Sequence, residues 1–266
     1  GGGGRALRRA GNRRDMKQAK IHFLGTGDAW HSEGRHHQAI LLRLAEGNVL
    51  VDAGSTVCLS LDHAGPGTAE LDRIFITHLH GDHIAGWPFL LLRMVFQDER
   101  ERPLTISGPP GTRETFESLA RLCYSDSSLY EKIAFEILYE ELPVGERRDV
   151  DGSGLLVDTF AMAHHATSIG YVFSSEGSRI GISGDTGWCP GLDRLVGASD
   201  TLVLECTTVE EAGAKHLSLA DLRAHQGLFE GKRTFLVHLG AGVDAALASE
   251  PLAGVEAASD GLVAAL

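Results

Sequence analysis

A run of metal-binding residue types constrains this chain more than any other feature. It reads HLHGDH over residues 78–83 and follows RIFIT, an apolar stretch typical of a short buried strand. Four ligands in so tight a turn cannot easily surround one tetrahedral ion, but they can serve two adjacent ions. Side-chain alternation assigns His78 and His80 to one ion, and Asp82 and His83 then face a second. Imidazole and carboxylate groups suit Zn²⁺, and they also bind Mn²⁺ or Fe²⁺.

Composition narrows the class of protein. The chain has 266 residues, of which 43% are hydrophobic, enough to bury a full core. It carries 36 acidic against 24 basic residues, a net charge of -12, and 13 histidines. The net negative charge of the chain repels the phosphates of nucleic acid and so disfavours electrostatic binding of nucleic acid. The histidine excess favours metal binding or proton transfer.

The basic residues gather at the start of the chain. Five arginines and one aspartate among residues 1–15 contribute +4, which leaves -16 on the rest. We predict a disordered basic tail over residues 1–19 and one hydrolase domain over residues 20–266. A start at Met16 is an alternative account of the tail, and an arm that binds an anionic partner is a less favoured one.

Strand and helix patterns alternate along the chain, which predicts an α/β fold. Ser218 is expected to cap the helix that it precedes. Helices are expected over 55–63, 112–124 and 218–229, from 89 onward and after 244. Strands are expected over 21–27, 39–44, 48–54, 73–78, 104–111, 133–140, 155–164, 170–175, 179–185, 200–207 and 234–240.

The cysteines and the hydropathy of the sequence indicate the cellular compartment of the protein. The four cysteines are far apart and form no CxxC pair, which favours reduced thiols in a cytoplasmic protein. No apolar run reaches the roughly 18–20 residues that span a bilayer, so no membrane partner is expected.

The HLHGDH run resembles the HxHxDH motif of the metallo-β-lactamase superfamily. The resemblance continues in FAMAHHATSIGY, SGDTG and LVHLG, and it implies a four-layer αββα sandwich. FAMAHHATSIGY offers His164 or His165 as the third histidine, and the spacing to the following serine and glycine favours His164. SGDTG supplies Asp185 as a bridging aspartate, and LVHLG supplies His238.

The resemblance implies two divalent ions, most readily zinc, with manganese or iron as alternatives. One ion would be held by His78, His80 and His164, and the other by Asp82, His83 and His238. Asp185 would bridge the two ions, and a hydroxide between them would attack the substrate. Asp82 is also expected to hold the attacking water.

LGTG, SGPPGT, LECT and KHLSLADL are similar to segments of the ribonuclease Z group and its phosphodiesterase relatives. That similarity assigns His216 to assist catalysis and Glu205 to orient it. The plainer alternatives are a histidine beside a helix and a charge at a strand end.

One feature departs from the long-arm ribonucleases Z, which insert a basic, tRNA-gripping arm in the region before the bridging aspartate. Asp185 follows His164 by only 21 positions, and Arg179 is the one lysine or arginine between them. Phosphate contacts supply most non-specific affinity for nucleic acid. We therefore favour a small-molecule or exposed phosphodiester substrate over a tRNA precursor.

The sequence thus predicts a metal-dependent phosphodiesterase. Alternatives with the same site are a lactonase, an arylsulfatase-like enzyme or a β-lactamase, and less favoured is a tRNA 3′-processing endonuclease. The resemblance also makes a homodimer an open expectation. His36, His37 and Trp30 lie near the expected mouth of the site, where substrate contact and ordinary surface or packing roles both remain open.

Overall fold

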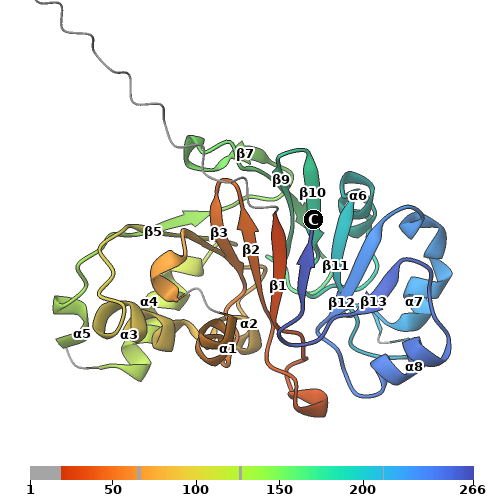
Figure 1. Ribbon diagram of the computed structural model, residues 1–266, viewed down its shortest axis with the longest axis horizontal. Helices are drawn as coiled ribbons and strands as arrows, with labels where there is room; N and C mark the ends of the chain where they lie inside the picture. The colour runs from red at the N-terminus through yellow and green to blue at the C-terminus, as the bar shows by residue number, and fades with distance from the viewer. Residues whose placement is uncertain (1–18, 65–66, 126–127, 212) are drawn as a thin grey trace, which may run out of the picture.

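Two β-sheets pack face to face, and helices cover both outer faces (Figure 1). The computed structural model describes residues 19–266 except 65–66, 126–127 and 212. The predicted basic tail therefore lies outside the described residues, apart from residue 19. The layers run helix, sheet, sheet, helix, which confirms the predicted αββα sandwich.

The first sheet has seven strands in the order β14-β1-β2-β3-β4-β5-β6. Strands β14 to β3 pair antiparallel, and strands β3 to β6 pair parallel. The strands are β1 (Lys20–Gly25), β2 (Ala39–Leu44), β3 (Gly47–Val51), β4 (Arg73–Phe75), β5 (Leu104–Gly108), β6 (Ile137–Glu141) and β14 (Val263–Ala265).

The second sheet also has seven strands, in the order β13-β12-β11-β10-β9-β8-β7. Strands β7 to β10 pair antiparallel, and strands β10 to β13 pair parallel. The strands are β7 (Arg147–Asp149), β8 (Leu156–Ala161), β9 (Ile169–Ser175), β10 (Ser178–Ile182), β11 (Thr201–Glu205), β12 (Arg233–Val237) and β13 (Val255–Ala257).

The helices divide between the two outer faces: α1, α3 and α4 pack on the first sheet, and α6, α7 and α8 on the second (Figure 1). The helices are α1 (Val57–Ala64), α2 (Gly81–Ile84), α3 (Trp87–Phe96), α4 (Thr112–Cys123), α5 (Ser128–Glu131), α6 (Pro190–Ala198), α7 (Leu219–Ala224) and α8 (Val243–Ser249). Short 3₁₀ turns are η1 (Ser32–Gly34), η2 (Thr68–Glu70), η3 (Val150–Gly152) and η4 (Gln226–Phe229). None of the helices in the described part of the chain is long and apolar enough to cross a membrane.

Continuous apolar runs build the inner strands because both faces of each sheet are covered. In β2, Ile40 and Leu42 enter the core between the sheets, while Ala39 and Leu41 face the helices. Aromatic rings fill the inner core: Phe75 lies edge-on to Phe173, with ring centroids 5.1 Å apart. This core holds the two halves in one orientation, so that loops from both sheets meet at one edge.

The structure confirms most of the expected elements and changes their limits. Strand β4 ends at Phe75 rather than at residue 78, because the next backbone groups bind elsewhere: the amide of Thr77 donates to Asp52. The predicted helix over 218–229 ends at Ala224 and continues as a 3₁₀ turn. Ser218 caps it as expected. Strands β7, β13 and β14 were not predicted, since such short edge strands exist only through pairing with distant partners.

Two cross-sheet hydrogen bonds fix the segment that leads into the HLHGDH run. The buried Tyr171 hydroxyl in β9 donates to the carbonyl of Ile76 at 2.6 Å, and the amide of Ile169 donates to Thr77 at 2.9 Å. We expect Tyr171→Phe to lower the free energy of unfolding by about 1–3 kcal/mol, because the buried carbonyl of Ile76 loses the hydroxyl that donates to it. Urea denaturation of the metal-free protein measures this change.

Tyr130→Phe is the matched control. The Tyr130 hydroxyl is buried and has no hydrogen-bond partner among the described residues. Its removal should change stability by less than about 0.5 kcal/mol. Equal effects of the two substitutions would contradict a specific role for the Tyr171 bond.

Candidate metal centre

The candidate ligands come from the carboxyl ends of strands in both sheets. His78 follows β4 in the first sheet, while Asp185 and His238 follow the parallel strands β10 and β12 in the second. Carboxyl ends of parallel strands meet at one edge of a sheet, where ligands commonly bind. The sandwich therefore brings together residues that are up to 160 positions apart in the sequence.

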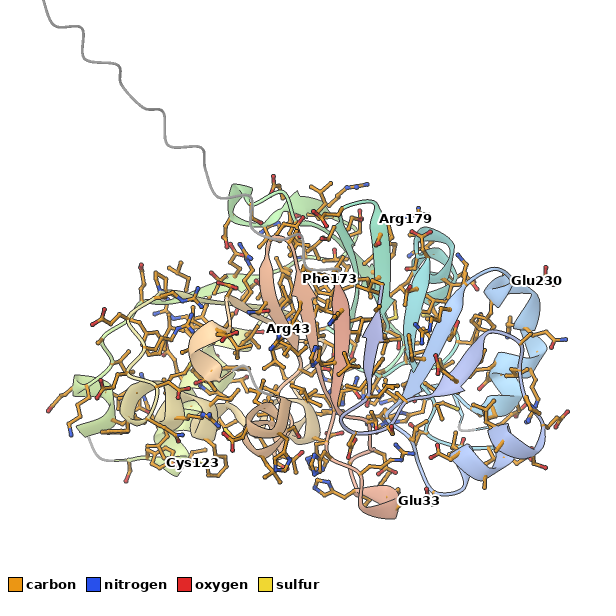
Figure 2. The ribbon with its side chains drawn as sticks, in the orientation of Figure 1. Glu33, Arg43, Cys123, Phe173, Arg179 and Glu230 are labelled. Atoms are coloured by element: carbon orange, nitrogen blue, oxygen red, sulfur yellow. The ribbon has the colours of Figure 1, made fainter. Side chains whose placement is uncertain are left out.

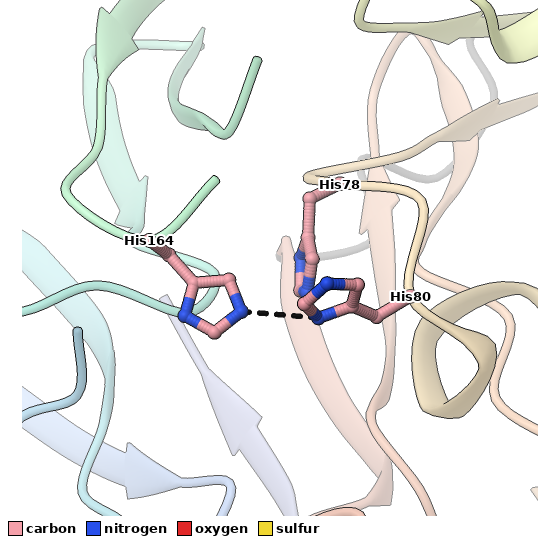
Figure 3. A group of neighbouring side chains, drawn as sticks. All are labelled: His78, His80 and His164. Atoms are coloured by element: carbon pink, nitrogen blue, oxygen red, sulfur yellow. Dashed lines mark hydrogen bonds between the residues drawn. The ribbon is translucent and has the colours of Figure 1, made fainter. Parts of the chain in front are cut away.

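His78, His80 and His164 form the first group of side chains. Their ligand nitrogens all lie within 4.8 Å of one another. The Nε2 atom of His164 lies 3.1 Å from Nδ1 of His80, and Figure 3 shows the three rings turned toward one point between the segments that carry them. His78 is fully buried.

Asp82, His83, Asp185 and His238 form the second group, again within 4.8 Å. Nε2 of His238 lies 3.2 Å from Oδ2 of Asp82 and 3.4 Å from Oδ2 of Asp185. Nε2 of His83 lies 3.3 Å from Oδ1 of Asp185. All four side chains face a common centre.

Asp185 lies between the groups. Its Oδ2 atom is 3.8 Å from Nε2 of His78 and 3.9 Å from Nε2 of His164, both members of the first group. The same carboxylate contacts two histidines of the second group. A carboxylate in this position can contact cations on both sides.

Unsatisfied buried atoms show that the site fits a cation. The Nε2 atoms of His78 and His83 and Oδ1 of Asp185 are buried without a hydrogen-bond partner among the described residues. Leaving buried polar atoms unpaired is costly, and such atoms call for an ion or a water molecule as a partner. Imidazole and carboxylate donors suit divalent transition metals. The cluster can hold divalent metal ions.

Two positioning residues escaped the sequence analysis. The fully buried carboxylate of Asp52 lies 2.8 Å from Nδ1 of His83 and accepts the backbone amide of Thr77. Asp52 has a left-handed backbone (φ 60°), an unusual conformation for a residue other than glycine. The sequence signal was an aspartate directly after a buried strand, in VLVDAG.

Thr207 is the second of these residues, and it joins the second group to the predicted His216–Glu205 pair. With Nε2 of His238 facing the carboxylates, its Nδ1 donates to the Thr207 hydroxyl at 3.0 Å. That hydroxyl donates to Oε2 of Glu205 at 2.8 Å. Threonine within LECT carries no chemical signal in the sequence, so only the structure finds it.

His216 and Glu205 lie beside the cluster. Nδ1 of His216 donates to Oε1 of the buried Glu205 at 2.9 Å and is 4.0 Å from Oδ2 of Asp185. The backbone amide of Thr186 also donates to Glu205. The side chain of His216 remains about one quarter exposed.

The remaining histidines join neither group of candidate ligands. The ring of His165 is exposed and hydrogen-bonds to Thr167, whereas His164 enters the first group. His225 stacks on Trp188 at 3.7 Å, away from the two ligand groups. His37 borders the site without joining a group, and His36 binds the hydroxyl of Ser60 instead.

The two groups differ in charge before a metal binds. Burial, aided by the charge of His83, lowers the pKa of His78 to about 2, so its ring is neutral. Burial would also lower the pKa of His238, but the charge of Asp185 and the hydrogen bond to Asp82 outweigh it and raise the pKa to about 9. Burial likewise opposes ionisation of Asp82, yet the hydrogen bond with His238 and the nearby ring of His83 hold its pKa well below the usual range.

Comparison with known proteins identifies the family. The family model described as anti-Pycsar protein Apyc1 matches residues 19–251, a range that contains every residue of both groups. The chain belongs to this family.

Relatives place the Apyc1-family chain in the metallo-β-lactamase superfamily, near ribonuclease Z. It is 42% identical to ribonuclease Z of Methanothermobacter thermautotrophicus over 105 residues, 40% of this chain and 34% of that protein. It is 33% identical to ribonuclease Z of Halorubrum lacusprofundi over 157 residues, 59% of this chain and 48% of that protein. The matches thus span half or less of these curated relatives.

Solved structures share the whole fold. The short form of human tRNase Z superposes with a TM-score of 0.72 at 26% identity, covering 92% of this chain and 98% of that one. The metallo-β-lactamase fold protein YhfI from Bacillus subtilis superposes with a TM-score of 0.75 at 19% identity, covering 93% and 99%. Fold, family and cluster together place this Apyc1-family chain among metallo-β-lactamase-fold proteins that resemble ribonuclease Z.

Thr207→Val tests the hydrogen-bonded link behind the second group. Valine keeps the shape but cannot hold His238, so we expect divalent metal binding to weaken about 10- to 100-fold, measured by competition with a chelator. Thr208→Val is the matched control, because among the described residues the hydroxyl of Thr208 donates only to the carbonyl of Glu210. Equal metal affinities of the two variants would contradict the role of Thr207.

Metal uptake should release protons from the second group. Below a pKa of about 9 the ring of His238 is protonated in the metal-free protein, and a nitrogen that binds a metal must lose its proton. We expect the apparent affinity to rise with pH up to about 9, with roughly one proton or more released per protein at pH 7. Calorimetric titrations in buffers of different ionisation enthalpy measure the release, and a buffer-independent heat would contradict it.

Proposed function

We propose that this chain is a binuclear metal-dependent phosphodiesterase that acts on a small or exposed phosphodiester. The observation that carries the proposal is the place of His216. Its ring is held by the buried Glu205, lies 4.7 Å from the ring of His164, and is partly exposed. A proton donor at the rim of a two-group metal cluster suits the departure of an alkoxide from phosphorus.

We also assign roles to the candidate metal ligands, on the basis of the two groups that they form. We assign one cation to the first group and a second to the second group, with Asp185 between them, and the donor set favours Zn²⁺ over Mn²⁺ or Fe²⁺. Bound divalent ions lower the pKa of water and offset the negative charge of a phosphoryl group. The residues in these roles are His78, His80, His164, Asp82, His83, Asp185 and His238.

Two residues of the chain, His216 and Asp82, would assist the proton transfers that phosphodiester hydrolysis requires. Burial lowers the pKa of His216, but the hydrogen bond and charge of Glu205 more than compensate and raise it above the usual histidine value. More of the imidazolium form is then present at neutral pH, ready to protonate the leaving oxygen. The carboxylate of Asp82, with 14% of its side chain exposed, can orient the attacking water.

RNA processing is the second candidate, and the names of the curated ribonuclease Z relatives favour it. Two features of this chain oppose it. Between His164 and Asp185 the structure contains only a turn and the β9–β10 hairpin, with no inserted arm. The part of the chain after residue 15 carries a charge of -16, which repels RNA phosphates.

A substrate panel with three variants tests the proposal. We expect hydrolysis of bis(p-nitrophenyl) phosphate, and little turnover of an acyl-homoserine lactone, nitrocefin or a precursor tRNA. His216→Asn should reduce kcat about 10²- to 10⁴-fold with metal content unchanged, because only the proton donor is lost. Asp185→Asn should lose both metal and activity.

His165→Asn serves as the control, since His165 lies next to a candidate ligand in the chain but outside both groups. It should keep full activity and metal content. Clear lactone opening beside background phosphodiester turnover would overturn the proposal. Efficient cleavage of the precursor tRNA at physiological salt would favour the second candidate.

A further inference from the structure

Two cations face each other at the end of the β1–β2 pair that is remote from the metal centre. Lys20 stands directly opposite Arg43 in the antiparallel register. The metal centre lies beyond the other end of β1, where the amide of Leu239, the residue after a candidate ligand, donates to Thr26. In Figure 2 the labelled Arg43 lies over the first sheet, well above Glu33 in the connection that follows β1. The proposed chemistry does not use this end of the sheet.

Both cations belong to the outer face of the first sheet. Side chains alternate between the two faces of a strand. Leu24 of β1 and Leu41 of β2 pack in the core between this sheet and its helices. Lys20 and Arg43 lie an even number of positions from these leucines, so they share the outer face. Like charges directly opposite each other in a sheet are destabilising.

Neither cation is neutralised by a neighbour. Among the described residues, the side chains of Lys20 and Arg43 form no ion pair and no hydrogen bond. The Nε atom of Arg43 is buried without a partner. A buried donor without an acceptor is costly, and a guanidinium cannot lose its proton to avoid that cost. An anion between the two side chains would remove both penalties.

The two side chains line a cavity of about 650 Å³ beside the turn between β2 and β3. Ligand pockets commonly enclose about 300–1,000 Å³. Three acids also line the cavity, but Asp72 pairs with Arg102, and Glu46 accepts the hydroxyl of Ser175. Glu70 is the third acid, and its carboxylate has no such partner among the described residues. The unpaired cations therefore outnumber the unpaired acid.

His22 senses the charge of the two cations. It follows Lys20 by two positions on the same face, is only 9% exposed, and lines a second cavity of about 300 Å³. Burial, together with the charges of Arg43 and Lys20, lowers the pKa of its ring. The other titratable side chains that line this second cavity are His36, His63 and Asp260. The ring of His22 is thus a local probe of the charge beside it.

We propose that Lys20 and Arg43 form a binding site for a dianionic phosphate group, either the free ion or the phosphate of a small metabolite. A dianion matches the charge of the two cations, and a guanidinium can donate two parallel hydrogen bonds to phosphate oxygens. The bound group would replace repulsion between β1 and β2 by two ion pairs. The site is separate from the metal centre and does not depend on the proposed function, because it uses none of the candidate metal ligands.

NMR of the His22 ring in the metal-loaded protein tests the site locally, so that phosphate bound at the metals does not obscure the result. His22→Gln assigns the ring signals. We expect inorganic phosphate to shift these signals saturably and to raise the apparent pKa of the ring by about one pH unit, because the anion offsets the two cations. Sodium chloride at equal ionic strength should give a smaller shift that does not saturate.

Four substitutions define the groups that bind the anion. Arg43→Gln should weaken phosphate binding about ten-fold or more, and it should raise the pKa of His22 even without phosphate. Lys20→Gln, at an exposed position, should weaken binding about three-fold, and Glu70→Gln should strengthen it. Arg179→Gln is the matched control, because it makes the same change of net charge at an exposed arginine of the second sheet (Figure 2). It should leave binding unchanged.

Glycerol 3-phosphate in place of inorganic phosphate identifies the source of the anion. Tighter binding of the ester would assign the cavity to a phosphorylated metabolite, and equal or weaker binding would assign the site to the free ion. Both outcomes support the site. Absence of a saturable shift with either compound would overturn the proposal. An unchanged response in both Arg43→Gln and Lys20→Gln would also overturn it.

Discussion

The buried carboxylate of Asp185 is the constraint on which the centre depends. Its side chain is only 3% exposed, and a charge at that depth is tolerated only if opposite charge or hydrogen-bond donors surround it. Those partners come from both halves of the sandwich: His83 follows β4 in the first sheet, and His238 follows β12 in the second. The two sheets must therefore pack in one orientation, which the aromatic core and the Tyr171 hydrogen bond provide.

The same constraint explains the layers of polar residues behind the cluster. Asp52 fixes the ring of His83, and Thr207 connects His238 to Glu205. These bonds leave the Nε2 atoms of the rings facing the centre, so the cluster is arranged before a cation arrives. A pre-arranged set of donors favours tight binding, because little reorganisation accompanies uptake of the metal.

The chain shares its fold with proteins of different names, and fold alone does not decide substrate. The human tRNase Z structure and this chain superpose over more than nine tenths of each. Near its candidate site this chain has a bare hairpin after His164, and the chain as a whole is acidic.

The sequence by itself determined the α/β class, most strands and the candidate ligands of the HLHGDH run, because apolar periodicity and that spacing are local patterns. The candidates His164, Asp185 and His238 came from the resemblance to the metallo-β-lactamase superfamily. It left His164 and His165 as alternatives, and only the turn after β8 directs His164 into the first group. Tertiary structure alone revealed β14, Asp52 and Thr207. Their roles arise from contacts with residues distant in sequence, as when β14 pairs with β1 or Thr207 with His238. No local pattern encodes such contacts, since they exist only once the two sheets have closed on their shared core.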